Sequence, residues 1–174
     1  MRLDLKMLLR ANLEGANRVA VLGVGSELRG DDQAGLLVAQ RLRKRCKLNR
    51  SCPQIELFHG ATAPENLTGE IRQYRPSHLI LIDAADVGKA PGTVEFISPE
   101  SISGVSFSTH GMPLKILADY MRESIHCKVM VIGIQPKALE YNGPVSAEIR
   151  ASVRQVATAI EAIIREIPDS QVGP

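Results

Sequence analysis

The stretch VLGVGSELRGDDQAGLL, residues 21–37, joins the end of an apolar strand to the start of a helix. Residues 18–25 are apolar enough for a buried strand, and apolar residues recur at helical spacing over 34–42. A glycine-rich turn between strand and helix usually binds an anion such as phosphate, because helix-start N–H groups point outward there. This turn carries two adjacent acids instead, Asp31 and Asp32. The acids would repel a phosphate, so the turn favours a cation.

Strands and helices alternate along the rest of the chain. The sequence predicts strands at 18–25, 54–58, 78–87, 92–97 and 127–134, and helices at 31–45, 64–74, 110–124 and 145–167. Strands separated by helices imply a largely parallel sheet that is covered on both faces. No repeat, low-complexity tract or linker interrupts the alternation. We therefore expect a single domain over residues 1–174, with the ends before about residue 17 and after residue 168 at its periphery.

One connection departs from this alternation. Only the nine residues AADVGKAPG (84–92) separate the strand LILID from the strand TVEFI, and a parallel crossover needs more. We therefore expect residues 93–97 to run antiparallel and to pair with the strand before them, with bends at Gly88 and Gly92. The predicted fold is an α/β, three-layer α/β/α sandwich whose mixed five-stranded sheet has one antiparallel strand.

The composition is that of an ordinary globular chain, with 44% apolar residues, 23% charged residues and a net charge of +2. So small a charge gives no general attraction to nucleic acid, and 3% aromatic residues leave little surface for base stacking. The charged N-terminal segment is unlike a signal peptide, and no apolar run reaches the length of a membrane span. We expect a soluble, cytoplasmic monomer that binds no nucleic acid and does not insert into a membrane.

Two or three acids and one histidine are predicted to meet at one edge of the sheet. Ligands of such sheets bind beyond the carboxyl ends of the parallel strands. Asp31 and Asp32 follow the first strand, Asp83 ends the third, and His110 opens the helix after the antiparallel strand. Carboxylates and a neutral imidazole suit a divalent metal ion such as zinc, nickel or manganese.

Each of these residues also has a purely structural interpretation. Asp31 fits the position of a helix N-cap, which leaves Asp32 to be explained. His110 could be an ordinary helix-start residue, although a helix N-terminus keeps imidazole neutral, the form that binds metals. Asp83 is harder to explain structurally, because a carboxylate directly after LILI needs a strong partner or a metal.

Several other sites are disfavoured. The turn lacks the third glycine of a dinucleotide-binding motif, and no G-x-S-x-G nucleophile turn is present. The six basic residues within 41–50 favour a solvated helix end over a docking patch, and both remain open. His59 and His78 flank strands and are predicted to be structural. No cysteine pair has C-x-x-C spacing, so Cys46, Cys52 and Cys127 are expected to be reduced thiols.

Five motifs resemble the hydrogenase maturation endopeptidases in order and spacing. They are GVGSELRGDDQAG (23–35), HGATAPEN (59–66), LILIDAADVGKAPGTV (79–94), STHGMPLKIL (108–117) and VIGIQP (131–136). The resemblance spans about residues 18–156 and is greatest to the branch that processes group 4 membrane-bound, hydrogen-evolving hydrogenases. It implies a phosphorylase/hydrolase-like fold. It also implies an aspartic or metal-type, nickel-dependent endopeptidase that removes the C-terminal extension of a nickel-iron hydrogenase large-subunit precursor after nickel insertion.

The resemblance further implies that Asp32, Asp83 and His110 contact the nickel carried by the substrate, for which zinc or cadmium could substitute. The nickel would serve as a recognition token, or it would polarise the scissile carbonyl or activate water. Some relatives carry an aspartate after the second strand, where this chain has His59. Two alternatives stay open: a nickel-binding hydrogenase assembly factor that does not cut, and a phosphorylase- or nucleoside-binding enzyme, which the two adjacent acids disfavour.

Overall fold

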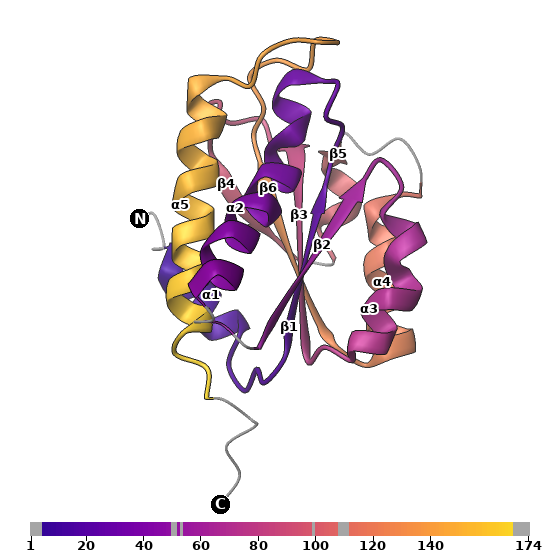
Figure 1. The fold of residues 1–174 in the computed structure, drawn as a ribbon. Helices are drawn as coiled ribbons and strands as arrows, with labels where there is room; N and C mark the ends of the chain where they lie inside the picture. The colour runs from indigo at the N-terminus through magenta and orange to yellow at the C-terminus, as the bar shows by residue number, and fades with distance from the viewer. Residues whose placement is uncertain (1–4, 50–51, 53, 99, 108–111, 169–174) are drawn as a thin grey trace, which may run out of the picture.

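The computed structural model describes residues 5–49, 52, 54–98, 100–107 and 112–168. Figure 1 shows a central sheet with helices α1, α2 and α5 on one face and α3 and α4 on the other. The predicted three-layer α/β/α sandwich with a mixed sheet is therefore confirmed. Among the described helices, none has the length and apolarity needed to cross a bilayer.

The elements follow the predicted alternation, with an additional helix near the N-terminus that was not predicted. The strands are β1 (Val19–Val24), β2 (Ile55–Ala61), β3 (His78–Asp86), β4 (Val94–Ile97), β5 (Ser106–Phe107) and β6 (Lys128–Ile134). The α-helices are α1 (Leu5–Asn12), α2 (Ala34–Asn49), α3 (Thr68–Tyr74), α4 (Leu114–Ile125) and α5 (Ala147–Ile164). Three short 3₁₀ helices are η1 (Gly30–Gln33), η2 (Pro64–Leu67) and η3 (Ile102–Gly104).

Strand β3 is the centre of the sheet, whose order is β2-β1-β3-β6-β4. It pairs in parallel with β1 on one side and with β6 on the other. Its first eight residues are buried, because helices cover both faces of the strand. A continuous apolar run of this kind is what a parallel strand needs, and it explains why the sequence alone located β3.

The orientation predicted for β4 is confirmed, but its predicted partner is wrong. Strand β4 runs antiparallel to β6, with Val94 opposite Ile134 and Ile97 opposite Val131. Both edges of β3 are occupied by the parallel strands β1 and β6, so β4 pairs instead with the outer edge of β6. The connection bends where expected, because Gly88 and Gly92 adopt positive φ angles of 67° and 81°.

A sixth strand was not predicted. Strand β5 has only two residues, and it pairs antiparallel with the last part of β3, Phe107 opposite Ala85 and Ser106 opposite Asp86. So short a strand has no periodicity of its own, which is why sequence patterns do not reveal it. Its effect is to return the chain after β4 to the end of β3 that follows Asp83.

The core is divided by the sheet into two apolar clusters. One lies under α1, α2 and α5, and the other under α3 and α4. The N-terminal segment belongs to the first, because Leu9 of α1 is fully buried and Leu13 is 4% exposed. The prediction that the chain before residue 17 is peripheral is therefore wrong. Residues 169–174 lie outside the described residues.

Helix α2 packs against the sheet through two glycines. A Cβ on Gly35 would lie 2.0 Å from the carbonyl oxygen of Ile82, and a Cβ on Gly23 would lie 2.3 Å from that of Gly35. Real Cβ atoms never come so close to backbone, so only glycine allows this contact. The start of α2 is thereby held beside the residue that precedes Asp83.

His78 is a structural histidine, as predicted. Its side chain is 4% exposed at the start of β3, and its Nδ1 lies 2.9 Å from Ser77 Oγ. Burial, together with the positive charge of Lys128 on the neighbouring strand, lowers the pKa of His78 below its ordinary value of 6.5. The folded protein therefore favours the neutral imidazole.

This shift predicts that acid destabilises the protein through His78. As the pH falls through 6.5, the unfolded chain gains a proton at His78 that the folded protein does not bind, so the free energy of unfolding decreases. Urea unfolding at about pH 7.5 and about pH 5.5 measures the decrease. The decrease should be smaller in His78→Asn, which cannot be protonated. An equal decrease in both proteins would assign the acid sensitivity to other groups.

Candidate active site at the carboxyl edge of the sheet

Asp32 lies in η1, the single turn between β1 and α2. Its side chain is fully buried, and its Oδ2 accepts a hydrogen bond of 3.0 Å from the backbone N–H of Ser26. The turn folds tightly because Gly25 has a φ of +141° and leaves no room for a side chain: a Cβ there would lie 1.8 Å from the carbonyl oxygen of Asp32. The glycine after β1 is therefore needed so that the backbone of Asp32 can pack against it, and not so that a phosphate can bind.

Asp83 lies in β3 and is also fully buried. Its Oδ1 accepts a hydrogen bond of 2.8 Å from the N–H of Ala84. Gly35 touches β3 at Ile82, the residue immediately before Asp83, and η1 is in contact with the same strand. Both acids are therefore buried on adjoining elements at the carboxyl edge of the sheet.

Two carboxylates buried at one edge could supply oxygen ligands to a hard or borderline cation. Burying two like charges together is costly, and a divalent cation or a shared proton relieves the repulsion. The described residues fit a metal ion only in part, since they contain no group of three or more His, Cys, Asp or Glu side chains placed to hold one. Asp32 and Asp83 by themselves are an incomplete ligand shell.

His110, the third predicted ligand, lies outside the described residues. The last described residue before His110 is Phe107 in β5, which lies opposite Ala85 of β3. Ala85 is two residues beyond Asp83 on the same strand. The described chain before His110 therefore ends beside the part of β3 that follows Asp83.

Asp31 has a role that differs from the predicted one. Asp31 is inside η1, and the residue at the cap position of that turn is Arg29, whose side chain makes no capping hydrogen bond. The fully buried Asp31 carboxylate instead accepts three backbone N–H groups, from Lys137 at 2.8 Å, Ala138 at 3.1 Å and Ser146 at 2.6 Å. The N-cap prediction is wrong, and Asp31 ties η1 to the loop between β6 and α5.

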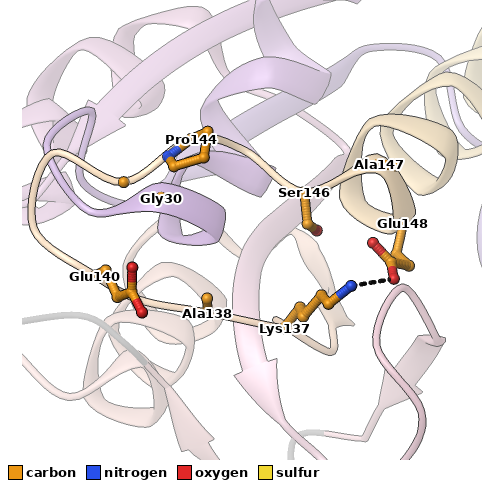
Figure 2. Close-up of a pocket in the computed structure, with 9 residues that line it drawn as sticks. Gly30, Lys137, Ala138, Glu140, Pro144, Ser146, Ala147 and Glu148 are labelled. Carbon is orange, nitrogen blue, oxygen red and sulfur yellow. Dashed lines mark hydrogen bonds and ion pairs between the residues drawn. The ribbon is translucent and has the colours of Figure 1, made fainter.

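That loop forms a pocket of about 360 Å³ beside η1 (Figure 2). Its lining residues are Gly30, Lys137, Ala138, Glu140, Gly143, Pro144, Ser146, Ala147 and Glu148. Lys137 Nζ is 2.7 Å from Glu148 Oε1, an ion pair that raises the pKa of Lys137 and lowers that of Glu148. Neither Asp32 nor Asp83 lines the pocket, so it adjoins the acids without containing them.

The basic run at the end of α2 is partly structural. Arg43 donates to the carbonyl oxygen of Leu57 on the edge strand β2 at 2.7 Å, and Arg45 forms an ion pair with Glu161 of α5. Lys44 is exposed, as the solvated-face interpretation expects. Two of these basic side chains therefore hold neighbouring elements to α2.

His59 lies within β2, not in the loop after it. It is exposed, and its Nε2 is 3.1 Å from Glu27 Oε1 in the turn that leads to η1. The three cysteines are thiols and are buried. Cys52 precedes β2 and Cys127 precedes β6, at the amino ends of strands and opposite the two acids.

Comparison with known proteins identifies the family. The sequence profile described as hydrogenase maturation protease matches residues 36–166. The hydrogenase 3 maturation protease of Escherichia coli K12 is 35% identical over 142 residues, 81% of this chain and 87% of the relative. The chain belongs to the hydrogenase maturation protease family.

Two solved structures of the family have the same fold. The crystal structure of a [NiFe] hydrogenase maturation protease from Thermococcus kodakarensis KOD1 has a TM-score of 0.81 and 30% identity, and covers 90% of this chain and 98% of that one. The solution structure of an Escherichia coli endopeptidase has a TM-score of 0.70 and 33% identity, with 83% and 90% covered.

The contacts of Asp31 predict that it is needed for stability. Asp31→Ala removes one acceptor from three backbone N–H groups and should lower the free energy of unfolding by about 2–4 kcal/mol. Glu148→Ala is the control, because this acid lines the pocket beside the same loop but its carboxylate is partly exposed and pairs with Lys137, so its loss should cost much less. Urea unfolding of both variants measures the difference. A midpoint for Asp31→Ala equal to that of the unmodified protein would contradict the anchoring role.

Proposed function

We propose that the protein is an endopeptidase that removes the C-terminal extension of a nickel-iron hydrogenase large-subunit precursor after nickel insertion. Membership of the hydrogenase maturation protease family supports this activity. So do the related enzymes, one described as acting in hydrogenase 3 maturation and one as an endopeptidase. The motifs of the sequence lead us to propose a group 4 membrane-bound, hydrogen-evolving hydrogenase as the source of the precursor.

The observation that carries the proposal is the pair of fully buried carboxylates, Asp32 and Asp83, on adjoining elements at the carboxyl edge of the sheet. Peptide hydrolysis at such a pair needs either a cation or a proton shared between the acids. A phosphate-binding enzyme would place backbone N–H groups or basic side chains at this turn instead. Buried acids beside the turn favour a substrate that brings positive charge.

Nickel in the precursor fits that requirement. Asp32 and Asp83 would provide two oxygen ligands, and His110, which follows β5, would provide a neutral imidazole. Three such ligands form an incomplete shell, which a metal already held by the precursor could complete. Cys52 and Cys127 lie at the opposite edge of the sheet, so they are remote from this set.

We propose that the nickel acts as a recognition token. The backbone N–H groups of Ser26 and Ala84 hold one oxygen of each carboxylate, which fixes the direction in which the acids face. An acid pair held in this way would attract a precursor site that carries a metal cation more strongly than the same site without the cation. A bound metal can in addition polarise a carbonyl group or lower the pKa of water. Recognition by charge would make cleavage depend on prior nickel insertion.

This proposal predicts that the two acids are needed for cleavage but not for folding. Asp32→Asn and Asp83→Asn keep an oxygen that can accept the Ser26 and Ala84 N–H groups, and they remove the buried negative charge. Each variant should abolish cleavage of a nickel-loaded precursor, measured by the mass of the product. Each should unfold at the same temperature as the unmodified protein or at a higher one, because like-charge repulsion is relieved.

The control for these variants is Glu166→Gln. Glu166 pairs with Arg10 at 2.8 Å near the end of α5, remote from the acids, and its replacement should leave cleavage unchanged. His110→Ala should behave as the two Asn variants do. Full cleavage by Asp32→Asn and Asp83→Asn would exclude these acids from the reaction. A stable complex of the unmodified protein with the loaded precursor, without any cut, would identify an assembly factor instead of a protease.

The token role also predicts where the nickel comes from. The purified protein should contain little metal and bind Ni²⁺ weakly, because three oxygen and nitrogen ligands without thiolate hold late divalent metals less tightly. A nickel-free precursor should remain uncut even with excess protease. Elemental analysis of the purified protein and mass spectrometry of the precursor measure both. One equivalent of resident metal, together with efficient cutting of the nickel-free precursor, would make the protein an ordinary metallopeptidase.

A further inference from the structure

Two cysteines far from the candidate active site lie in direct contact. Cys46 is in the last part of α2 and Cys52 is in the segment that leads to β2. Their Sγ atoms are 3.0 Å apart, and the residues are 4% and 6% exposed. A disulfide requires sulfur atoms at about 2 Å, so the two must approach by only about 1 Å. Side-chain rotation can supply a movement of that size.

We propose that Cys46 and Cys52 are a site of reversible disulfide formation, with a small-molecule disulfide as the oxidant. The proposal is independent of the proposed function, because the pair lies at the end of α2 opposite to Asp32. In the reaction, the two thiols lose their S–H bonds and form one S–S bond. The S–S bond of the oxidant breaks, and its two halves leave as thiols that carry the two protons and two electrons.

The surroundings of the pair determine the order of the two steps. Burial, the contact with Cys52 and the nearby carboxylate of Glu161 raise the pKa of Cys46 to about 12. Glu161 is held beside it by Arg45 of α2 and by Arg165, whose Nη2 is 2.6 Å from Glu161 Oε1. Only a thiolate attacks a disulfide, so the raised pKa of Cys46 disfavours Cys46 as the first nucleophile. In the proposed reaction, Cys52 therefore attacks the oxidant first. Cys46 then displaces the oxidant from Cys52 and closes the protein disulfide.

The bond would turn the existing contact between the Cys46 and Cys52 side chains into a covalent link. Both cysteines belong to the apolar cluster under α1, α2 and α5, so the bond would lie within packed structure. It would join the end of α2 to the chain that enters β2, an edge strand of the sheet. Closing this loop restricts the unfolded chain and should raise the melting temperature by about 5 °C.

Cys127 provides the matched control within the same chain. It is as buried as the pair, at 5% exposed, but it belongs to the cluster on the other face of the sheet. Its Sγ contacts the carbonyl oxygen of Met121 at 3.7 Å. An oxidant that selects for the contact between Cys46 and Cys52 should therefore leave Cys127 as a thiol.

The test is incubation of the full-length protein with oxidised glutathione, followed by thiol counting under denaturing conditions and peptide mapping. The thiol count should fall from three to one, with a Cys46–Cys52 linkage in the map. The melting temperature should rise and return to its starting value after reduction. The variant Cys127→Ala should behave in the same way, whereas Cys46→Ala should keep a stable glutathione adduct on Cys52 and show no rise.

Three results would overturn the proposal. The first is a folded, unmodified protein that keeps all three thiols at equilibrium with the oxidant. The second is a stable glutathione adduct that Cys46 does not displace. The third is a linkage that involves Cys127 or a second copy of the chain. Because the thiol count, the peptide map and the melting temperature are all measured on the unmodified protein, the result does not depend on whether the alanine variants fold.

Discussion

Helix α2 meets the sheet with no side chain between the two backbones. Gly35 lies against the carbonyl oxygen of Ile82, and Gly23 lies against the carbonyl oxygen of Gly35. A methyl group at either position would need space that backbone atoms already fill. The helix would have to move outward, and η1 would move with it because η1 leads directly into α2. The position of the two acids at the edge of the sheet thus depends on two glycines that take no part in the chemistry.

Two adjacent acids in η1 have different partners. Asp31 accepts backbone N–H groups of residues 137–146, which satisfy its carboxylate inside the protein. Asp32 is equally buried, but its Oδ2 accepts the backbone N–H of Ser26, in the segment that joins β1 to η1. Neighbours in the sequence thus differ in role: Asp31 anchors the turn to the loop before α5, and Asp32 is the acid that we propose for the site.

The sequence predicted those parts of the fold that depend on local pattern. Strands β1, β3 and β6 are continuous apolar runs, and the short 84–92 connection required an antiparallel strand. The burial of Asp83 followed from its place directly after LILI, and the structure bears it out. These inferences hold because each uses neighbours in the chain, and the sheet then brings the strand ends together.

What the sequence did not reveal depends on contacts between distant residues. The partners of Asp31 lie 106 to 115 positions further along the chain, and no local motif marks them. The pairing of β4 with β6 was missed for the same reason, since the edge of β3 is occupied by strands from elsewhere in the sequence. The contact of Cys46 with Cys52 joins residues whose spacing in the sequence matches no recognised motif. Residue spacing therefore predicted the candidate site, and long-range contacts determine how its elements are held.

The anchoring of Asp31 has a consequence for biosynthesis. A chain growing from the ribosome makes β1, η1 and α2 long before it makes the N–H donors at Lys137, Ala138 and Ser146. Until those residues emerge, the Asp31 carboxylate lacks all three of these donors, and the turn that carries Asp32 lacks its anchor to the loop between β6 and α5. The hydrogen bonds that hold this turn can therefore form only after most of the chain has been made.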